Sequence, residues 1–189
     1  MVDPGSVTPT TPIPPIVLPS VPSINPGSGE APKKVEKHPR FKFPCNKDAL
    51  AVSDELKKLF TDLADYTNIG IGGISFEDKP IRDGARIEIS TWLTSMLPLT
   101  KTFHVVVTDL QPKGWTFTTE SDHVFYPGTI TFSIVETNDG QLEFQIDILG
   151  ETSGVSGYIG FVAGGGQFED LTWEHLAKQI RTRICGNKK

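Results

Sequence analysis

The most regular feature of the sequence is an alternation of apolar and polar residues between Gly84 and Gly150. A period of two is typical of β-strands that bury one face and expose the other. Turn-forming residues interrupt the alternation at 111–114, 126–128 and 138–140, and the last of these, Asn-Asp-Gly, is typical of a tight hairpin. The pattern predicts consecutive antiparallel strands. Their inward positions are Ile87, Ile89, Phe103, Val105, Val107, Trp115, Phe117, Ile130, Phe132, Ile134, Leu142, Phe144, Ile146 and Ile148.

Two other segments have the period of an amphipathic helix. Residues 48–65 and 168–184 carry apolar residues three or four positions apart, which predicts helices that pack on an apolar surface. His175 lies off the apolar stripe of the second helix, so we expect it to face solvent. The stripes are Val52, Leu56, Leu59, Phe60 and Leu63 in the first helix, and Trp173, Leu176, Ala177, Ile180 and Ile184 in the second.

Three shorter segments complete the predicted domain. Residues 41–43 alternate and predict a short strand. Residues 68–76 are rich in glycine, but they follow a helix and lead into strand-like residues, whereas a phosphate-binding loop opens a helix. We interpret them as a strand with glycine bends. Residues 150–166 predict a loop or a last irregular strand, which leaves the C-terminal helix to cover the apolar face of the sheet.

The first 40 residues differ in composition from the rest. Of the 15 prolines, 11 lie at or before Pro44, and the first aromatic residue is Phe41. Because proline fixes φ and lacks an N–H donor, residues 1–40 are predicted to be a disordered Pro-rich arm or linker, and residues 41–189 a single domain. The arm has three open interpretations: a solvated linker, a tether, or a Pro-rich ligand for a groove in a protein partner.

The net charge of the chain argues against nucleic acids and anionic membranes as partners. Lys and Arg number 18 against 23 Asp and Glu, which gives a net charge of −5. Proteins that bind nucleic acid or anionic membranes need a basic face, so neither partner is expected. No apolar run reaches the roughly 18 residues of a transmembrane segment. No secretory signal is recognisable, which favours the cytoplasm as the compartment.

Cysteine and histidine spacing gives little evidence of special chemistry. Cys45 and Cys185 are compatible with two unpaired thiols in a reducing compartment, or with one disulfide that joins the first element to the last helix. The histidines at 38, 104, 123 and 175 are scattered, without HExxH, HxH or CxxC. We therefore expect no metal site and no cofactor.

One turn carries residues capable of acid–base chemistry. Asp122 and His123 are adjacent and Tyr126 follows, and histidine titrates near neutral pH. Turns also use such residues for local reasons alone, and no third group orients the pair. The GxSxG motif of serine hydrolases is absent. His123 and Tyr126 are thus the candidates for a catalytic role, but the sequence favours a protein that is not an enzyme.

The order of the elements resembles the helix-grip fold of the SRPBCC superfamily, which includes START lipid-transfer domains, pollen-allergen-like proteins and polyketide aromatase/cyclases. The segments GARIEIS, FHVVVTDLQPKGWTFTT and TITFSIVETNDGQLEFQI are similar to the central strands of that superfamily. The turn SDHVFYPG is similar to the GHP..G turn of an uncharacterised bacterial branch, with Asp122 in place of the first glycine. By element order the resemblance covers residues 41–186.

The resemblance implies an α+β fold in which a curved antiparallel sheet of about six to seven strands wraps on a long C-terminal helix. It also implies a cavity between sheet and helix that binds a hydrophobic small molecule such as a lipid, a sterol or a polyketide-like compound. The expected ligand-binding residues come from inward strand positions and the helix stripe: Ile87, Ile89, Phe103, Val105, Trp115, Phe117, Phe132, Phe144, Trp173 and Ile180.

Fold does not fix function, so other interpretations stay open. The same side chains would also serve a packed core without a cavity. The domain would then be an interaction or delivery module that docks to a larger assembly through the Pro-rich arm. A cyclase or hydrolase of small hydrophobic substrates is the third alternative, and it requires polar groups that point into a cavity.

Overall fold

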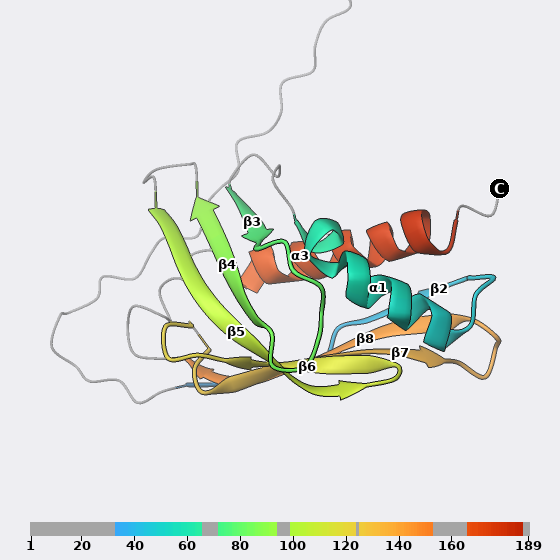
Figure 1. Cartoon of the computed structure of the whole chain (residues 1–189), viewed down its shortest axis with the longest axis horizontal. Coiled ribbons are helices and arrows are strands. Elements are labelled where there is room, and N and C mark those ends of the chain that lie inside the picture. Colours follow the sequence, from blue (N-terminus) through green and yellow to red (C-terminus); the bar gives the residue numbers. More distant parts are fainter. Residues whose placement is uncertain (1–32, 66–71, 94–98, 124, 153–165, 187–189) are drawn as a thin grey trace, which may run out of the picture.

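The computed structural model describes residues 33–65, 72–93, 99–123, 125–152 and 166–186. These residues form a curved antiparallel sheet with the helices on its concave side (Figure 1). The elements in chain order are β1 (Lys33–Lys37), β2 (Arg40–Phe43), α1 (Ala49–Ala64), β3 (Gly72–Phe76), β4 (Arg86–Leu93), β5 (Leu99–Gln111), β6 (Gly114–Thr119), β7 (Gly128–Glu136), β8 (Leu142–Thr152), α3 (Gly166–Gln179) and η2 (Ile180–Ile184).

The sheet is a meander from β3 to β8 with two short strands added at one edge. Its order is β1-β8-β7-β6-β5-β4-β3, and β2 also pairs with β8, so the eight strands occupy seven positions. Every pairing is antiparallel. The predicted α+β architecture, a curved antiparallel sheet with a C-terminal helix, is confirmed.

Strand β1 corrects the predicted start of the domain. The sequence placed residues 33–40 in the Pro-rich arm, but β1 pairs with β8 from Lys33 opposite Thr152 to Lys37 opposite Ile148. Val35 is buried between the exposed Lys34 and Glu36, and a single apolar residue among charged ones gives no periodic pattern. An edge strand needs few inward side chains, because the backbone supplies most of its contacts. Residues 1–32 lie outside the described part of the chain, so the arm prediction stands for them as a prediction.

Helix α1 fills the concave side of the sheet. The Asp48 side chain caps its first turn and accepts a hydrogen bond from the Ala51 N–H at 2.8 Å. The predicted stripe is buried, except that Leu59 is partly buried. Phe60 is fully buried at its centre. Its ring makes edge contacts, with centroids 5.2–5.5 Å apart, with the rings of Phe76, Trp115, Phe117 and Phe132.

The predicted C-terminal helix consists of two parts. Helix α3 ends at Gln179 and continues as the π-helical turn η2, which the Cys185 N–H closes by donating to the Ile180 carbonyl at 3.1 Å. The apolar stripe from Trp173 to Ile184 is buried as predicted. Ile180 and Ile184, at the two ends of this turn, are both buried. No described helix combines the length and the apolar character needed to cross a membrane.

His175 does not face solvent as the sequence suggested. Its side chain is half-buried and shares a hydrogen bond with the backbone of Asp65, at the end of α1. Burial and the nearby charge of Lys178 lower the pKa of His175, although the hydrogen bond opposes them. His175 therefore joins α3 to α1, a contact that the position of a residue on one helix does not reveal.

A disulfide joins the two ends of the domain. Cys45 follows β2 and Cys185 follows η2, with their Cα atoms 5.0 Å apart and a separation of 140 positions in sequence. The sequence was compatible with two free thiols or with one disulfide, and the structure has the disulfide.

Asp65 supplies the first testable prediction. Its carboxylate lies at the C-terminal end of α1 and accepts a hydrogen bond from the Phe76 N–H at 2.7 Å. Burial raises the pKa of Asp65, the hydrogen bond from Phe76 opposes the shift, and the neighbouring acidic groups add to it. A carboxylate at a helix C-terminus is also unfavourable. We expect Asp65→Asn, which keeps the acceptor and removes the charge, to raise the melting temperature at pH 7 by about 1–2 °C, after allowance for solvent screening.

The pH dependence of the stability gain in Asp65→Asn shows whether the charge of Asp65 is its cause. A raised carboxyl pKa means that wild type loses stability as pH rises from the ordinary value of 3.8 through the raised pKa. The advantage of Asp65→Asn should therefore vanish in acid, where wild type is protonated, and appear towards neutrality. Melting curves from pH 3 to 7 measure it, with the exposed Asp83→Asn as control. An advantage of equal size at every pH would contradict the electrostatic explanation.

Candidate functional site

The inner face of the sheet holds eight of the predicted ligand-binding residues, and the C-terminal helix carries the other two, Trp173 and Ile180. All ten lie in the core, and none is more than 8% exposed. They contact one another and α1 in a single hydrophobic cluster. Their inward orientation matches the alternation pattern, and their role in ligand binding stays a prediction.

One region where the core approaches solvent lies along three neighbouring strands. Phe76, Ile89 and Phe103 are register partners on β3, β4 and β5, and they are 6–8% exposed. Trp173 on α3 is similar at 6%, whereas Trp115 and Phe132 are at 1% or less. Ile74 on β3 is only partly buried against the cluster. The core is therefore covered less completely beside β3, β4 and β5 than around Trp115 and Phe132.

Two buried indole N–H groups have no acceptor. The Nε1 atoms of Trp115 and Trp173 are buried and make no hydrogen bond with the described residues, and neither does the Ser53 hydroxyl. An unsatisfied buried donor costs about 1–3 kcal/mol. Such groups are uncommon in native proteins and call for an explanation, such as a bound molecule that supplies the acceptor.

The hollow that the structure shows beside β6 and β7 is small. It has a volume of about 170 Å³, and Gly114, Thr116, Thr131 and Ser133 are among its lining residues. Sites for small molecules usually measure roughly 300–1,000 Å³. This hollow is not the cavity that the sequence predicted between sheet and helix.

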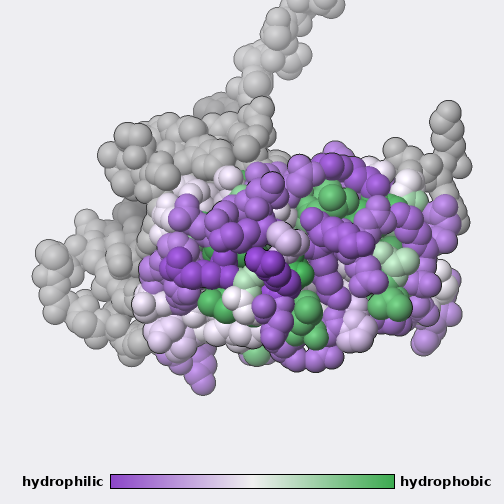
Figure 2. Space-filling view, viewed as in Figure 1, coloured by the Kyte–Doolittle hydropathy of each residue, from purple (hydrophilic) through white to green (hydrophobic). Residues whose placement is uncertain are grey.

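One face of the molecule is mainly polar. Figure 2 shows a face of mostly hydrophilic residues, with hydrophobic residues in small separate patches. The large apolar side chains that are exposed come from separate elements: Leu50, Leu110, Tyr126, Leu149 and Leu171. This face therefore offers no broad apolar surface for a protein partner.

The catalytic candidates do not share a site. His123 is 3% exposed, and its ring packs against Phe103 with centroids 4.5 Å apart. Its Nδ1 atom accepts a hydrogen bond from the Phe125 N–H at 3.2 Å. Tyr126 is 42% exposed. The structure thus gives His123 a packing role beside the core and places Tyr126 on the surface.

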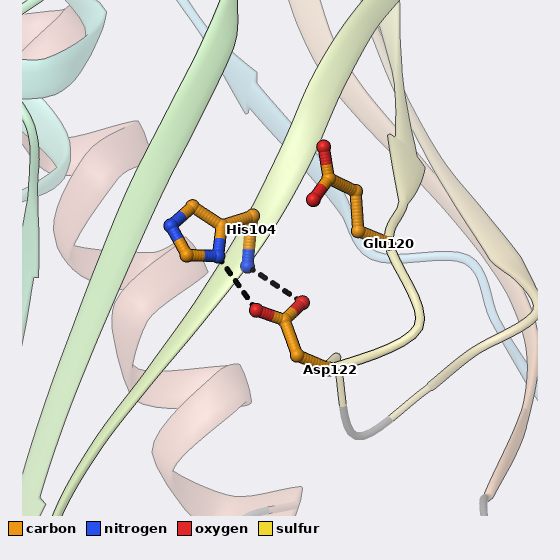
Figure 3. A group of neighbouring side chains, drawn as sticks. All are labelled: His104, Glu120 and Asp122. Carbon is orange, nitrogen blue, oxygen red and sulfur yellow. Dashed lines mark hydrogen bonds and ion pairs between the residues drawn. The ribbon is translucent and has the colours of Figure 1, made fainter.

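Asp122 pairs with a different histidine. Its carboxylate lies 2.6 Å from Nδ1 of His104 and accepts from the His104 backbone N–H at 3.2 Å (Figure 3). Partial burial would raise the pKa of Asp122, but the hydrogen bonds from His104 outweigh it and lower the pKa. Nearby Arg86 holds Glu120 through two bonds of 2.8 Å, which lower the pKa of that carboxyl. The pairing of β4 with β5 places Glu88 opposite His104. No local sequence pattern indicates that Asp122 and Glu120 also lie near this histidine.

Comparison with known proteins identifies the fold. No family model and no curated protein matches the chain. Among solved structures, Ara h 8.0201 is 11% identical with a TM-score of 0.54, covering 82% of this chain and 100% of that one. Protein SA2116 of Staphylococcus aureus, of unknown function, is 12% identical with a TM-score of 0.52, covering 81% and 97%. Protein CV1439 of Chromobacterium violaceum is 14% identical with a TM-score of 0.51, covering 80% and 98%.

These likenesses establish the architecture. The chain shares the fold of these solved structures, a curved antiparallel sheet with a long C-terminal helix, as the sequence predicted. Identities this low show the fold alone.

Proposed function

We propose that the protein binds a small hydrophobic molecule that carries a hydrogen-bond acceptor, held between the inner face of the sheet and α3. The observation that supports this most directly is the buried Nε1–H of Trp173, which has no acceptor among the described residues. An acceptor oxygen on an otherwise apolar ligand would satisfy that donor in a low-dielectric setting, where a hydrogen bond is strong. A lipid, a sterol and a polyketide-like compound all fit this description.

Binding must open a core that is packed in this structure. A ligand would enter most easily beside Phe103 and Ile89 on the sheet and Trp173 on the helix, because each of these side chains keeps a small exposure to solvent. A protein that must first adopt an open state binds with reduced apparent affinity, in proportion to the population of that state. We therefore expect affinities in the micromolar range for ligands that are not the natural one.

The other two functions have less support. A cyclase or hydrolase needs polar groups that face a cavity, whereas the His123 side chain packs against Phe103 and the Tyr126 side chain is exposed on the surface. The interaction or delivery module depends on residues 1–32, which lie outside the described part of the chain. The disulfide changes the expected compartment, because cytosolic thiols are kept reduced. An oxidising compartment suits this chain better than the cytoplasm.

Displacement of a fluorescent probe tests the proposal. The full chain is titrated with 1-anilinonaphthalene-8-sulfonate, and oleate, cholesterol and the polyketide-derived naringenin are then added as competitors. We expect saturable binding of the probe and displacement by at least one of the three. Native mass spectrometry of the purified protein should show a bound small molecule. If the folded chain binds neither the probe nor any competitor, the interaction module becomes the better interpretation.

Trp173→Phe tests the role of the indole directly. The substitution keeps an aromatic ring in the core and removes the N–H donor. Losing one neutral hydrogen bond of about 1 kcal/mol should weaken the best competitor about fivefold. Trp115→Phe is the comparison variant: Trp115 carries the other unsatisfied indole N–H, but it is 1% exposed and packs against Phe60 beneath α1, so a ligand held against α3 should not depend on it. Equal losses in the two variants would contradict a ligand contact specific to Trp173.

A further inference from the structure

The outer face of the sheet carries a cluster of metal-ligating side chains, on the side opposite the core. We propose that His104, Glu120 and Asp122 form a binding site for a first-row transition-metal ion of the zinc type. One ligand atom from each residue lies within 4.8 Å of the other two. The sequence predicted no metal site, because the three residues match no ligand-spacing motif and are brought together by the pairing of β5 with β6 and by the turn that follows.

The backbone holds this cluster in place. The Glu120 N–H donates to the His104 carbonyl at 3.1 Å, and the His104 N–H donates to Asp122 at 3.2 Å. The His104 side chain is only 17% exposed, so its ring has little freedom to lose when an ion binds. Preorganised ligands of this kind are what a metal site on a rigid element requires.

The charges around the cluster favour a cation. Glu88 on β4 lies 3.4 Å from Nε2 of His104, so three carboxylates surround the imidazole. The guanidinium of Arg86 binds this group by donating two hydrogen bonds to Glu120. Three negative charges against one positive charge leave an excess that a divalent ion would neutralise. Arg86 would then orient Glu120, whose carboxylate has lone pairs to spare for the ion.

The two ring nitrogens of His104 would divide the ion and the ring proton between them. In the structure Nδ1 donates to the Asp122 carboxylate at 2.6 Å. An ion at Nδ1 would replace that hydrogen bond, and the ring proton would then lie on Nε2, which is 3.4 Å from Glu88. Ligating histidines commonly donate their other N–H to a carboxylate in this way. Metal–ligand bonds of about 2.0–2.2 Å require Glu120 to move inward, and its side chain is 32% exposed and able to do so.

The donor set points to the class of metal. One imidazole with two carboxylates suits zinc and its neighbours in the first transition row, whereas calcium and magnesium prefer oxygen ligands alone. Three protein ligands leave at least one coordination position for water.

A second histidine, in the connection between β1 and β2, provides a matched control. His38 also contacts two carboxylates, with Nδ1 2.7 Å from Asp147 and Nε2 3.0 Å from Glu36. These carboxylates lie at opposite ring nitrogens, so they cannot converge on one ion. Arg40 also binds Asp147, at 2.5 Å.

Calorimetric titration tests the site. Zinc chloride is titrated into the full, oxidised chain without an affinity tag, and we expect one saturable site with a dissociation constant in the micromolar range. His104→Asn and Glu120→Gln should each weaken binding by about tenfold or more. His38→Asn should leave it unchanged, and calcium should not compete. Circular dichroism verifies folding, and Glu120→Gln, which preserves the bond between His104 and Asp122, tests the site if His104→Asn fails to fold.

Three results would overturn the proposal. The first is no saturable binding at roughly 100 µM zinc, where a micromolar site would be full. The second is equal affinity in wild type and in folded His104→Asn or Glu120→Gln. The third is calcium binding as tight as zinc binding, which would mean that the imidazole is not a ligand. None of these bears on the proposed ligand in the core, because the cluster lies on the other face of the sheet.

Discussion

Replacing Cys45 and Cys185 with alanine should lower the free energy of unfolding by up to about 5 kcal/mol, because the disulfide closes a very long loop. The two cysteines are 140 residues apart, so the unfolded chain loses much conformational freedom when they are joined. Since whole domains are stable by only about 5–15 kcal/mol, this is a large fraction of the total. Urea unfolding of the variant and of wild type measures the difference.

Reduction of the wild-type protein supplies the control. Wild type in excess dithiothreitol should unfold at the same urea concentration as the double alanine variant, and the variant itself should not respond to the reductant. If oxidised and reduced wild type unfold together, the disulfide contributes nothing to stability, and the compartment argument drawn from it loses its support.

Phe60→Ala should lower the free energy of unfolding by about 3–5 kcal/mol, the usual cost of removing a fully buried phenylalanine. The ring lies between α1 and the concave face of the sheet, with four aromatic rings around it. Its removal leaves a cavity at the centre of the core that these rigid neighbours cannot fill. Denaturant unfolding measures the change, with circular dichroism to show that the variant still folds.

Lys58→Ala is the matched control on the same helix. Lys58 is exposed, and such surface changes usually alter stability by about 0.5 kcal/mol or less. Similar effects from the two substitutions would mean that α1 does not pack on the sheet through the Phe60 face. Phe60→Ala also has a use for the proposed function, since a cavity beside Trp115 and Phe132 should increase the uptake of the fluorescent probe if the variant remains folded.

The strands from β4 to β8 could be predicted because their signal is local. Alternation such as that of Phe103, Val105 and Val107 depends only on neighbouring positions, and so does the apolar stripe of α1. Strand β1 was not predicted from the sequence, because its stability comes from backbone pairing with β8 and its own residues are mostly charged. Its presence depends on an edge that exists only once the rest of the sheet has formed.

Contacts between distant residues could not be predicted in the same way. The spacing of Cys45 and Cys185 is equally compatible with separation and with pairing, because nothing local measures their proximity. Asp122 was paired with its neighbour His123, but the turn directs its carboxylate to His104 on β5. The inward residues were correctly assigned to the core, yet the alternation pattern cannot distinguish a packed interior from one with room for a ligand.

The disulfide also determines how the domain would carry mechanical load. The covalent ring closed by Cys45 and Cys185 includes α1, all strands from β3 to β8, α3 and η2. Among the described strands, β1 and β2 lie outside the ring and are attached to β8 by backbone pairing. Tension between the two ends of the chain would detach β1 and β2, with the buried Phe43 of β2, and then pass through the sulfur–sulfur bond. The elements inside the ring would then bear no force. The domain can thus be pulled through its N-terminal segment without unfolding α1, the strands from β3 to β8 or the C-terminal helix.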